Sequence, residues 1–166
     1  VGIVVYPDEF IIPRSVEDEF GVVHEYDDVA SGEAWEGGPL LISWRDAQMA
    51  GEGYNVVIHE FAHKLDMLNG EADGIPPLPP GLSHRDWEET LLATYEDFCT
   101  RLDQAENDET FYETTRLDPY GAESPAEFFA VMSETFFEAP GVLRERYPAL
   151  YTLLCRFYRQ DPASDA

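Results

Sequence analysis

The chain carries, at residues 54–70, the stretch YNVVIHEFAHKLDMLNG. At about 100° per residue, several of its apolar side chains fall within one sector of a helix, and Gly70 stands where a C-terminal cap is expected. These apolar residues are Val57, Ile58, Phe61, Leu65 and Leu68. The spacing predicts a helix over residues 54–68 whose apolar face packs into the core.

The same stretch contains the pentapeptide HEFAH at residues 59–63, an H-E-x-x-H motif. Because residues four apart lie one turn apart on the same helix face, His59 and His63 can direct two neutral ring nitrogens at a single zinc ion. Glu60 projects beside them as the candidate catalytic carboxylate. Both histidines lie roughly opposite the apolar sector, so we expect one side of the helix to pack and the other to hold ligands.

Two other interpretations of the motif stay open. The histidines could be ordinary surface residues of an amphipathic helix. That interpretation requires two of the only four histidines in the chain to lie, with Glu60, at the motif spacing by chance. A closed structural site would need four protein ligands, usually rich in cysteine, whereas a catalytic zinc keeps three and leaves a position for water. Cys99 and Cys155 lie on apolar sides of predicted helices, so we expect buried, reduced thiols there.

A third metal ligand must come from elsewhere in the chain, and a carboxylate is the best candidate. Glu127 follows Ser124 by three residues, and this S-x-x-E spacing is also typical of a capping box, in which Glu127 only bonds back to a backbone N–H. On spacing alone the capping role is favoured. Glu134, seven residues further along the same helix face, is the fallback ligand, and Glu123 is a more distant one.

The remaining histidines and the nearby Asp66 are weaker candidates. His24 lies in a strand-like stretch and His84 at a helix start, so we expect surface or capping roles for both. Asp66 either orients an imidazole through its free N–H or is a solvated carboxylate near the helix end. The glycine and third histidine of the metzincins are absent from the sequence, as is the H-x-E with a distant P-C-x-x-C of the zinc deaminases.

The rest of the sequence predicts strands first and helices afterwards. Clusters of β-branched and aromatic residues between turn residues predict strands at 2–6, 9–12 and 22–26, and a hairpin of 32–35 with 40–44. Helical spacing and capping residues predict helices over 83–103, 124–138 and 143–158, a stop at Pro140, and irregular structure at 104–123. Residues 71–81, with four prolines, predict an ordered loop.

The surface must be strongly acidic. The chain has 34 Asp and Glu residues against 10 Lys and Arg residues, a formal net charge of −24, while 44% of its residues are hydrophobic. This apolar content suits a packed core, so we expect the charge on a folded surface. Such a surface repels phosphate groups, which excludes nucleic acid and anionic membranes as expected partners.

Three separated segments of the chain closely resemble one protein family. They are GYNVVIHEFAHKLD at 53–66, PAEFFAVMSE at 125–134 and FYRQDP at 157–162. All three are similar to the Mlc titration factor A family, cytoplasmic zinc metallopeptidases of bacteria. The zincin-like core of that family also resembles the protease domain of anthrax lethal factor.

The resemblance implies roles for five residues. His59, His63 and Glu127 would bind zinc, Glu60 would be the catalytic carboxylate, and the Tyr120 hydroxyl would hydrogen-bond the reacting oxygen. It also implies a cytoplasmic location. Because the chains of the family are longer, we expect residues 1–166 to form a single zincin-like catalytic domain, a fragment without an N-terminal helical region.

These features together predict an α+β fold. We expect a small, mostly antiparallel sheet packed on the metal helix, with Leu40 to Trp44 as an edge strand for an extended peptide, then three further helices. Both ligand-bearing helices should have their apolar faces in one core. The expected activity is zinc-dependent hydrolysis of peptide bonds by metal-activated water, with Glu60 as general base. The alternative is a metal-stabilised regulatory protein that sequesters a transcriptional repressor of the Mlc type.

The acidic, halophile-like composition, with Lys64 the single lysine beside nine arginines, yields a prediction about salt. Repulsion between surface carboxylates weakens a fold at low ionic strength, and salt screens that repulsion. We expect the free energy of unfolding to rise between roughly 0.1 M and multimolar salt, measured by urea denaturation at each salt concentration. A free energy of unfolding that stayed constant or fell over this range would contradict the expectation.

Overall fold

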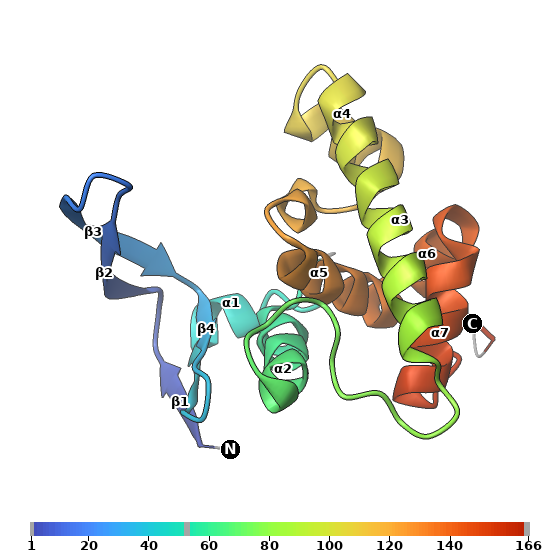
Figure 1. The fold of residues 1–166 in the computed structure, drawn as a ribbon, viewed down its shortest axis with the longest axis horizontal. Helices are drawn as coiled ribbons and strands as arrows, with labels where there is room; N and C mark the ends of the chain where they lie inside the picture. Colours follow the sequence, from blue (N-terminus) through green and yellow to red (C-terminus); the bar gives the residue numbers. More distant parts are fainter. Residues whose placement is uncertain (1, 52–53, 165–166) are drawn as a thin grey trace.

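The computed structural model describes residues 2–51 and 54–164, so Gly53 of the first quoted segment lies outside the described residues. Its architecture is α+β, as the sequence predicts, with the strands in the first part of the chain and most helices after them. Figure 1 shows the strands on one side of the molecule and the C-terminal helices on the other. The helix with the H-E-x-x-H motif lies between the two groups.

The strands form two separate sheets. Strands β1 (Ile3–Tyr6), β5 (Leu40–Ser43) and β4 (Gly32–Ala34) form one sheet in the order β1-β5-β4, with β1 parallel and β4 antiparallel to β5. Strands β2 (Phe10–Glu17) and β3 (Val23–Ala30) form an antiparallel ribbon. The pairing is mostly antiparallel, as predicted. The prediction that Leu40 to Trp44 form an edge strand is wrong. β5 is the buried central strand of its sheet, because its continuous apolar run suits burial on both faces, and β1 and β4 are the two edge strands.

The motif helix, α2 (Val56–Asp66), follows the short helix α1 (Trp44–Ala47) and ends in a 3₁₀ turn, η1 (Met67–Asn69). Asn55 caps α2, because its side-chain oxygen accepts a hydrogen bond from the Ile58 N–H at 3.1 Å. The Lys64 ammonium group of α2 donates hydrogen bonds to the carbonyl groups of Trp35 and Gly38. The turn between β4 and β5 is thereby tied to α2.

The predicted orientation of α2 is wrong. Phe61 and Leu68 of the predicted packing face are 39% and 69% exposed. The buried residues of the helix are instead Val56, His59, Glu60, Ala62 and Asp66. The motif face points inward because it packs on another helix, α5 (Pro125–Glu138), whose carboxylates give the histidines hydrogen-bonding partners.

The predicted loop at 71–81 and the helix after it are confirmed. No helix or strand is assigned in residues 71–81, and α3 (His84–Gln104) starts after Ser83, whose hydroxyl accepts a hydrogen bond from the Asp86 N–H. The prediction of irregular structure at residues 104–123 is wrong. It contains α4 (Asp108–Thr115), capped by the Asn107 side chain, and a 3₁₀ turn, η2 (Pro119–Ala122). The signal for α4 was the Asn cap followed by two acidic residues.

The C-terminal helices show how proline divides this region. The predicted bounds of α5 are confirmed, but Pro140 opens a helix, α6 (Pro140–Arg146), and does not simply stop the preceding one. The helix predicted over 143–158 is interrupted at Tyr147, and α7 (Pro148–Tyr158) follows. Proline suits the first turn of a helix and disfavours helical conformation in the residue before it, which explains both boundaries.

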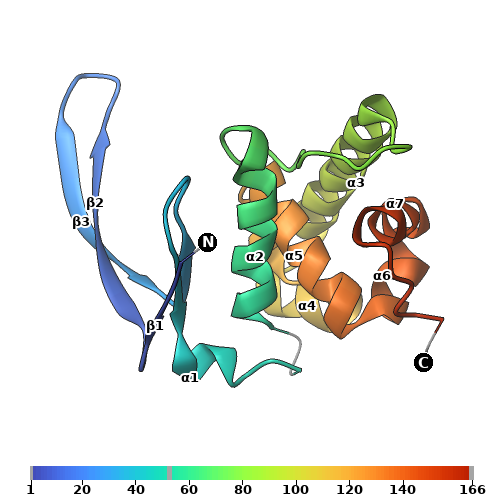
Figure 2. The ribbon, with the colours of Figure 1, turned by 90° about the horizontal axis from the view of Figure 1, so that it is seen from below.

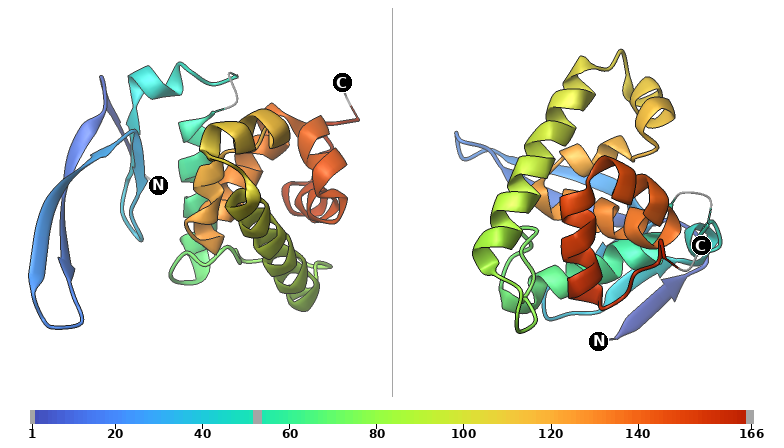
Figure 3. Two further views of the ribbon diagram at one scale, coloured as in Figure 1. Left: turned by 90° about the horizontal axis from the view of Figure 1, so that it is seen from above. Right: turned by 90° about the vertical axis from the view of Figure 1, so that its right-hand side faces the viewer.

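The large hydrophobic core surrounds α5. Its biggest fully buried side chains are Trp87, Phe98, Phe111, Phe128, Phe129 and Phe136. Figure 2 shows α2 between the strands and α5, and Figure 3 shows α3 and α7 on the far side of α5. From α2 only Ala62 is among the buried members of this core, and Val56 belongs to a second cluster with Leu40 and Ile42. The prediction that both ligand-bearing helices share one core through apolar faces is therefore wrong for α2.

Two further sequence-based points concern the cysteines and membrane insertion. Cys99 and Cys155 are free thiols, as predicted, but both are only half-buried. Within the described residues, every helix is too short or too polar to span a lipid bilayer.

Gly74 connects the three elements around the motif. Its N–H donates a hydrogen bond to the Asp66 carboxylate at 2.7 Å, and its carbonyl accepts one from the Trp87 indole at 3.0 Å. Its φ is +84°, and an added Cβ would lie 2.7 Å from the Pro125 carbonyl oxygen. Gly74 therefore links the end of α2, the start of α3 and the start of α5.

This geometry predicts that Gly74→Ala is strongly destabilising. Gly81, with φ of +93° and open space around its Cβ position, provides the matched control. Both substitutions carry the cost of a left-handed alanine, roughly 1–2 kcal/mol. Gly74→Ala adds the cost of displacing packed backbone, about 1–3 kcal/mol. Equal losses of unfolding free energy in the two variants, measured in urea, would show that Gly74 is not a packing point.

Candidate metal centre

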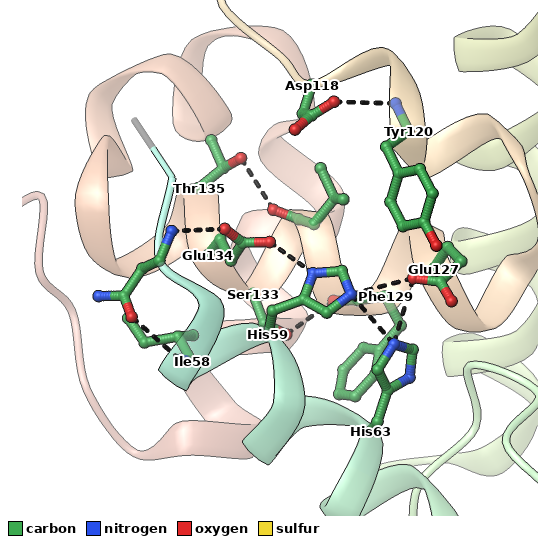
Figure 4. A network of polar contacts seen from close by, with 12 residues as sticks. Ile58, His59, His63, Asp118, Tyr120, Glu127, Phe129, Ser133, Glu134 and Thr135 are labelled. Carbon is green, nitrogen blue, oxygen red and sulfur yellow. Dashed lines mark hydrogen bonds and ion pairs between the residues drawn. The ribbon is translucent and has the colours of Figure 1, made fainter. Parts of the chain in front are cut away.

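Helices α2 and α5 bring three side-chain atoms to one point. The His59 Nε2 and His63 Nε2 atoms lie 3.1 Å apart, and the Glu127 Oε2 atom lies 3.0 Å from the first and 3.2 Å from the second. Figure 4 shows the two imidazoles rising from α2 toward Glu127 on α5. The histidines come together because they are one turn apart, and Glu127 reaches them from the first turn of the neighbouring helix.

The chemistry of these three atoms fits a metal cation. The other ring nitrogen of His59, Nδ1, lies 2.6 Å from Glu134 Oε1. An ionised carboxylate only accepts hydrogen bonds, so Nδ1 carries the proton and a neutral His59 presents a bare lone pair at Nε2. That lone pair faces the Glu127 carboxylate and the second imidazole. Such a convergence of acceptors needs a positive charge between them, and two imidazoles with one carboxylate suit zinc.

The electrostatic surroundings of these groups also favour positive charge at this point. Burial lowers the pKa of His59, but hydrogen bonds to Glu127 and Glu134 outweigh it and raise the pKa to about 10. Burial raises the pKa of Glu127, but hydrogen bonds to His59 and His63 outweigh it and lower the pKa to about 2. Both shifts have the same cause, because the carboxylates around the two imidazoles stabilise positive charge between them.

Glu134 lies behind His59. Its second oxygen accepts a hydrogen bond from the Asn55 N–H at 2.8 Å, and the Asn55 amide donates to Glu138 at 2.7 Å. The carboxylate therefore fixes both the start of α2 and the orientation of the His59 ring, as expected for a group behind a metal-ligating histidine. Glu134 contacts the Nδ1 atom of His59, on the side of the ring away from Glu127. It is therefore not one of the three converging atoms, and the alternative prediction of Glu134 as the third ligand does not fit this geometry.

Glu60 lies beside the histidines and is 6% exposed. A Cβ at Gly32 of β4 would lie 2.5 Å from the Glu60 Oε1 atom, so the edge strand packs directly against this carboxylate. Burial is the main cause that raises the pKa of Glu60 to about 7, although the charges of His59 and His63 oppose the shift. Glu60 therefore has little ordinary hydration, and it lines the same cavity as His59, His63 and Glu127.

Tyr120 faces the same point from η2. Its ring centroid lies 6.1 Å from that of His59, and its hydroxyl points toward the Glu127 carboxylate. The Tyr120 N–H donates a hydrogen bond to Asp118 at 2.9 Å, which fixes the turn. Burial, followed by the charge of Glu127, raises the pKa of Tyr120 to about 12. Its hydroxyl therefore stays protonated and can donate a hydrogen bond near neutral pH.

The predicted capping interaction at α5 is present in part. The Ser124 hydroxyl accepts a hydrogen bond from the Glu127 N–H at 3.2 Å. The Glu127 carboxylate, however, contacts both histidines. The residue thus uses its backbone for the cap and its side chain for the site, and Glu123 lies exposed outside it.

The remaining candidates lie elsewhere. His24 binds Asp18 at 2.9 Å in the exposed β2–β3 turn, and His84 is an exposed residue in the first turn of α3. The expectation of a solvated Asp66 carboxylate is wrong, because the side chain is fully buried and accepts the Gly74 hydrogen bond. Among the described residues, no histidine ring donates a hydrogen bond to Asp66, so its role in orienting an imidazole stays a prediction. Burial raises the pKa of Asp66 to about 6.

A cleft opens over the converging atoms. A cavity of about 390 Å³ and a neighbouring one of about 290 Å³ share six lining residues: Arg14, Gly32, Glu33, His59, Glu60 and Tyr120. Arg14 of β2 binds Glu33 of β4 through two hydrogen bonds of 2.9 and 2.7 Å, and binds Asp28 at 3.3 Å. Nothing in the spacing of the sequence indicated that Arg14 or Glu33 belongs to the site, because both come from strands whose arrangement only the fold defines.

Comparison with known proteins agrees with this geometry. Mlc titration factor A of Yersinia pestis (strain Pestoides F) is 43% identical over 166 residues, an alignment that covers 96% of this chain and 58% of the relative. The same protein of Yersinia pseudotuberculosis serotype O:3 (strain YPIII) gives the same values. The chain thus spans less than two thirds of the length of these curated relatives.

The match to a family model extends over most of the sequence. A model described as glucose-regulated metallo-peptidase M90 matches residues 1–159. The resemblance to Mlc titration factor A and the His-His-Glu group on α2 and α5 are consistent with this match. The chain belongs to the glucose-regulated metallo-peptidase M90 family.

Proposed function

We propose that the protein is a zinc-dependent peptidase whose metal ligands are His59, His63 and Glu127. The observation that carries the proposal is the convergence of three lone-pair atoms, 3.0 to 3.2 Å apart, beside a buried glutamate at the base of a cleft. Membership of a metallo-peptidase family supports it. Three protein ligands also leave one coordination position for water, as a catalytic zinc requires.

The surrounding residues suit the hydrolysis of a peptide bond. When bound, a zinc ion here would lower the pKa of a water molecule toward about 7 and polarise a carbonyl group. Glu60 takes the proton from the attacking water and returns it to the leaving amine. The Tyr120 hydroxyl donates a hydrogen bond to the oxygen that becomes negatively charged. Glu134 holds the His59 ring in the orientation and tautomer that this arrangement requires.

An extended peptide suits the edge of the cleft. Among the described residues, β4 pairs only with β5, so the other edge of β4 is free beside Glu60. A peptide strand added to this edge would form main-chain hydrogen bonds there, with its carbonyl groups close to the metal ligands. We infer that β4, in place of the predicted strand at 40–44, is the substrate-binding strand.

The role of Glu60 is tested by Glu60→Gln. The amide keeps the size of the side chain but cannot accept the proton, so we expect retained zinc and a fall in kcat of about a hundredfold or more. The measurement combines metal analysis with cleavage of a fluorogenic peptide library. Glu123→Gln removes an exposed carboxylate of the same region and is expected to keep full activity. Full activity in the Glu60→Gln protein would overturn the mechanism.

The role of Glu127 is tested by comparing Glu127→Ala with Ser124→Ala. Ser124→Ala removes the cap, with a cost of about 0.5–2 kcal/mol of stability, but leaves all three ligand atoms. Glu127→Ala removes a ligand atom and is expected to weaken zinc binding by more than about a hundredfold. That loss exceeds the roughly 10- to 100-fold loss expected when a residue that only orients a metal ligand is removed. Zinc affinity is measured by competition with a chelator. Equal affinities in the two variants would assign Glu127 a capping role alone.

A second candidate function is binding to a repressor of the Mlc type. The observation that favours it is the name of the relatives, Mlc titration factor A, at 43% identity. Capture of such a repressor by the zinc-loaded Glu60→Gln protein, without cleavage, would support binding as a function separate from hydrolysis. Absence of capture by this variant and by the wild type would contradict it.

A further inference from the structure

The β2–β3 ribbon, residues 10–30, is joined to the rest of the molecule by few contacts. Its two strands pair with each other along their length and, among the described residues, with no third strand. Figures 1 and 2 show the ribbon extending away from the helices. At its base, the Phe10 ring stacks on Tyr6 of β1, with ring centroids 4.7 Å apart. Within the part of the chain that the structure describes, Arg14 is the one ribbon side chain with hydrogen bonds to a residue outside the ribbon.

The Arg14 guanidinium connects the ribbon to β4. Its two terminal nitrogens donate hydrogen bonds to the two carboxylate oxygens of Glu33 at 2.9 and 2.7 Å, which is a bidentate pair. Its Nε atom donates to Asp28, on the same face of the ribbon, at 3.3 Å, and this bond orients the guanidinium. The Glu33 side chain is only 18% exposed. Water and salt therefore screen this pair less than they screen an ordinary surface pair.

The strand that Arg14 reaches is held on both of its faces. Successive side chains of a strand point to opposite faces, so the Glu33 side chain and the Cβ position of Gly32 lie on opposite faces of β4. Gly32 meets Glu60 of α2, where an added Cβ would come within 2.5 Å of the Oε1 atom. Glu33 meets Arg14 on the other face. Next to Glu60, β4 is therefore enclosed between the motif helix and the ribbon.

The short length of β4 explains why it needs this support. The strand has three residues and, among the described residues, pairs only with β5. The outer bonds of this pairing run from the Ser43 N–H to the Ser31 carbonyl at 2.7 Å and from the Trp35 N–H to the Pro39 carbonyl at 3.2 Å. A pairing with so few contacts opens more readily than a core strand. Contact with α2 blocks movement of β4 toward the helix, and the ion pair with Arg14 restrains movement away from it.

We propose that Arg14, acting through Glu33, is a positioning residue that holds the free edge of β4 beside Glu60, where an extended peptide can pair with it. This inference rests on the proposed peptidase function and adds to it a residue from a strand that supplies no metal ligand. Arg14 and Glu33 line both cavities of the cleft. Loss of their pair should raise KM more than it lowers kcat, because the proposed metal ligands and Glu60 belong to α2 and α5 and stay in place.

The experiment measures KM and kcat of the zinc-loaded protein with one fluorogenic peptide long enough to lie along β4. Arg14→Met keeps the apolar stem of the side chain but removes the guanidinium, and Glu33→Gln removes the carboxylate charge. We expect each variant to raise KM about tenfold, which corresponds to 1.4 kcal/mol of binding, with kcat little changed. The double variant should be no worse than either single variant, because the effects of two residues that act as one unit do not add.

The matched control is Arg45→Met, which breaks the pair of Arg45 with Asp8 at 3.0 Å. Asp8 lies between β1 and β2, but neither residue of this pair lines the cleft, so KM should not change. Metal analysis and urea denaturation show whether each variant keeps its zinc and its fold. If Arg14→Met does not, Arg14→Lys takes its place, because lysine keeps the charge but not the bidentate geometry.

Hydrogen exchange measures the position of β4 without turnover. The Ser43 and Trp35 amides report on its pairing, because their hydrogen bonds stand at the two ends of the strand. We expect both amides to exchange at least about tenfold faster in Arg14→Met than in the wild type, for the same 1.4 kcal/mol of lost support. Arg45→Met should leave their exchange unchanged.

The outcomes distinguish this inference from the proposed function. An unchanged KM in folded, zinc-loaded Arg14→Met, or an equal rise in Arg45→Met, would overturn the positioning role while peptidase activity stands. Additive effects of Arg14→Met and Glu33→Gln would also overturn it, because they would indicate two independent contacts with the substrate. If the wild type cleaves no peptide, the peptidase proposal fails. In that case, faster exchange of the two amides in Arg14→Met would still support the role of Arg14 in holding β4, and unchanged exchange would overturn it.

Discussion

The hydrogen bond between Glu134 and His59 is the contact on which the rest of the site depends. It joins α5 to α2 at 2.6 Å and fixes the proton on the Nδ1 atom of His59. The same carboxylate holds the first turn of α2 through the Asn55 N–H. A polar helix face can be buried here because each of its histidines meets a carboxylate of the neighbouring helix.

This constraint also explains where the sequence was informative. The H-E-x-x-H spacing identified His59, Glu60 and His63 as one constellation, because a single helical turn relates them. The bounds of α5 followed from its Ser-Pro start, and the loop at 71–81 followed from its prolines. These features depend on neighbouring residues alone, and local pattern is sufficient for them.

The errors concern tertiary packing. The apolar sector of α2 predicted burial of Phe61 and Leu68, but the helix turns the opposite face inward, where its histidines contact carboxylates of α5. Hydrophobic periodicity reflects only the tendency of apolar side chains to leave water. It does not include the hydrogen bonds that carboxylates of a helix distant in sequence, here α5, offer to polar side chains. Arg14 and Glu33 entered the cleft only through strand pairing, which residue spacing does not reveal. The same holds for β4, whose position at the sheet edge depends on the parallel pairing of β1 with β5.

Residues from both the strands and the helices shape the cleft. β4 and Tyr120 line the space over the candidate ligands, and Glu60 lies against Gly32, where an added Cβ would come within 2.5 Å of the Glu60 Oε1 atom.

Anomalous X-ray diffraction at the zinc absorption edge, from crystals of the protein grown with zinc, locates the bound metal. We expect one strong peak bounded by the Nε2 atoms of His59 and His63 and a carboxylate oxygen of Glu127, with Glu134 still hydrogen-bonded to His59 Nδ1. A peak at any other position, or the absence of a peak at this one in a protein loaded with zinc, would contradict this expectation.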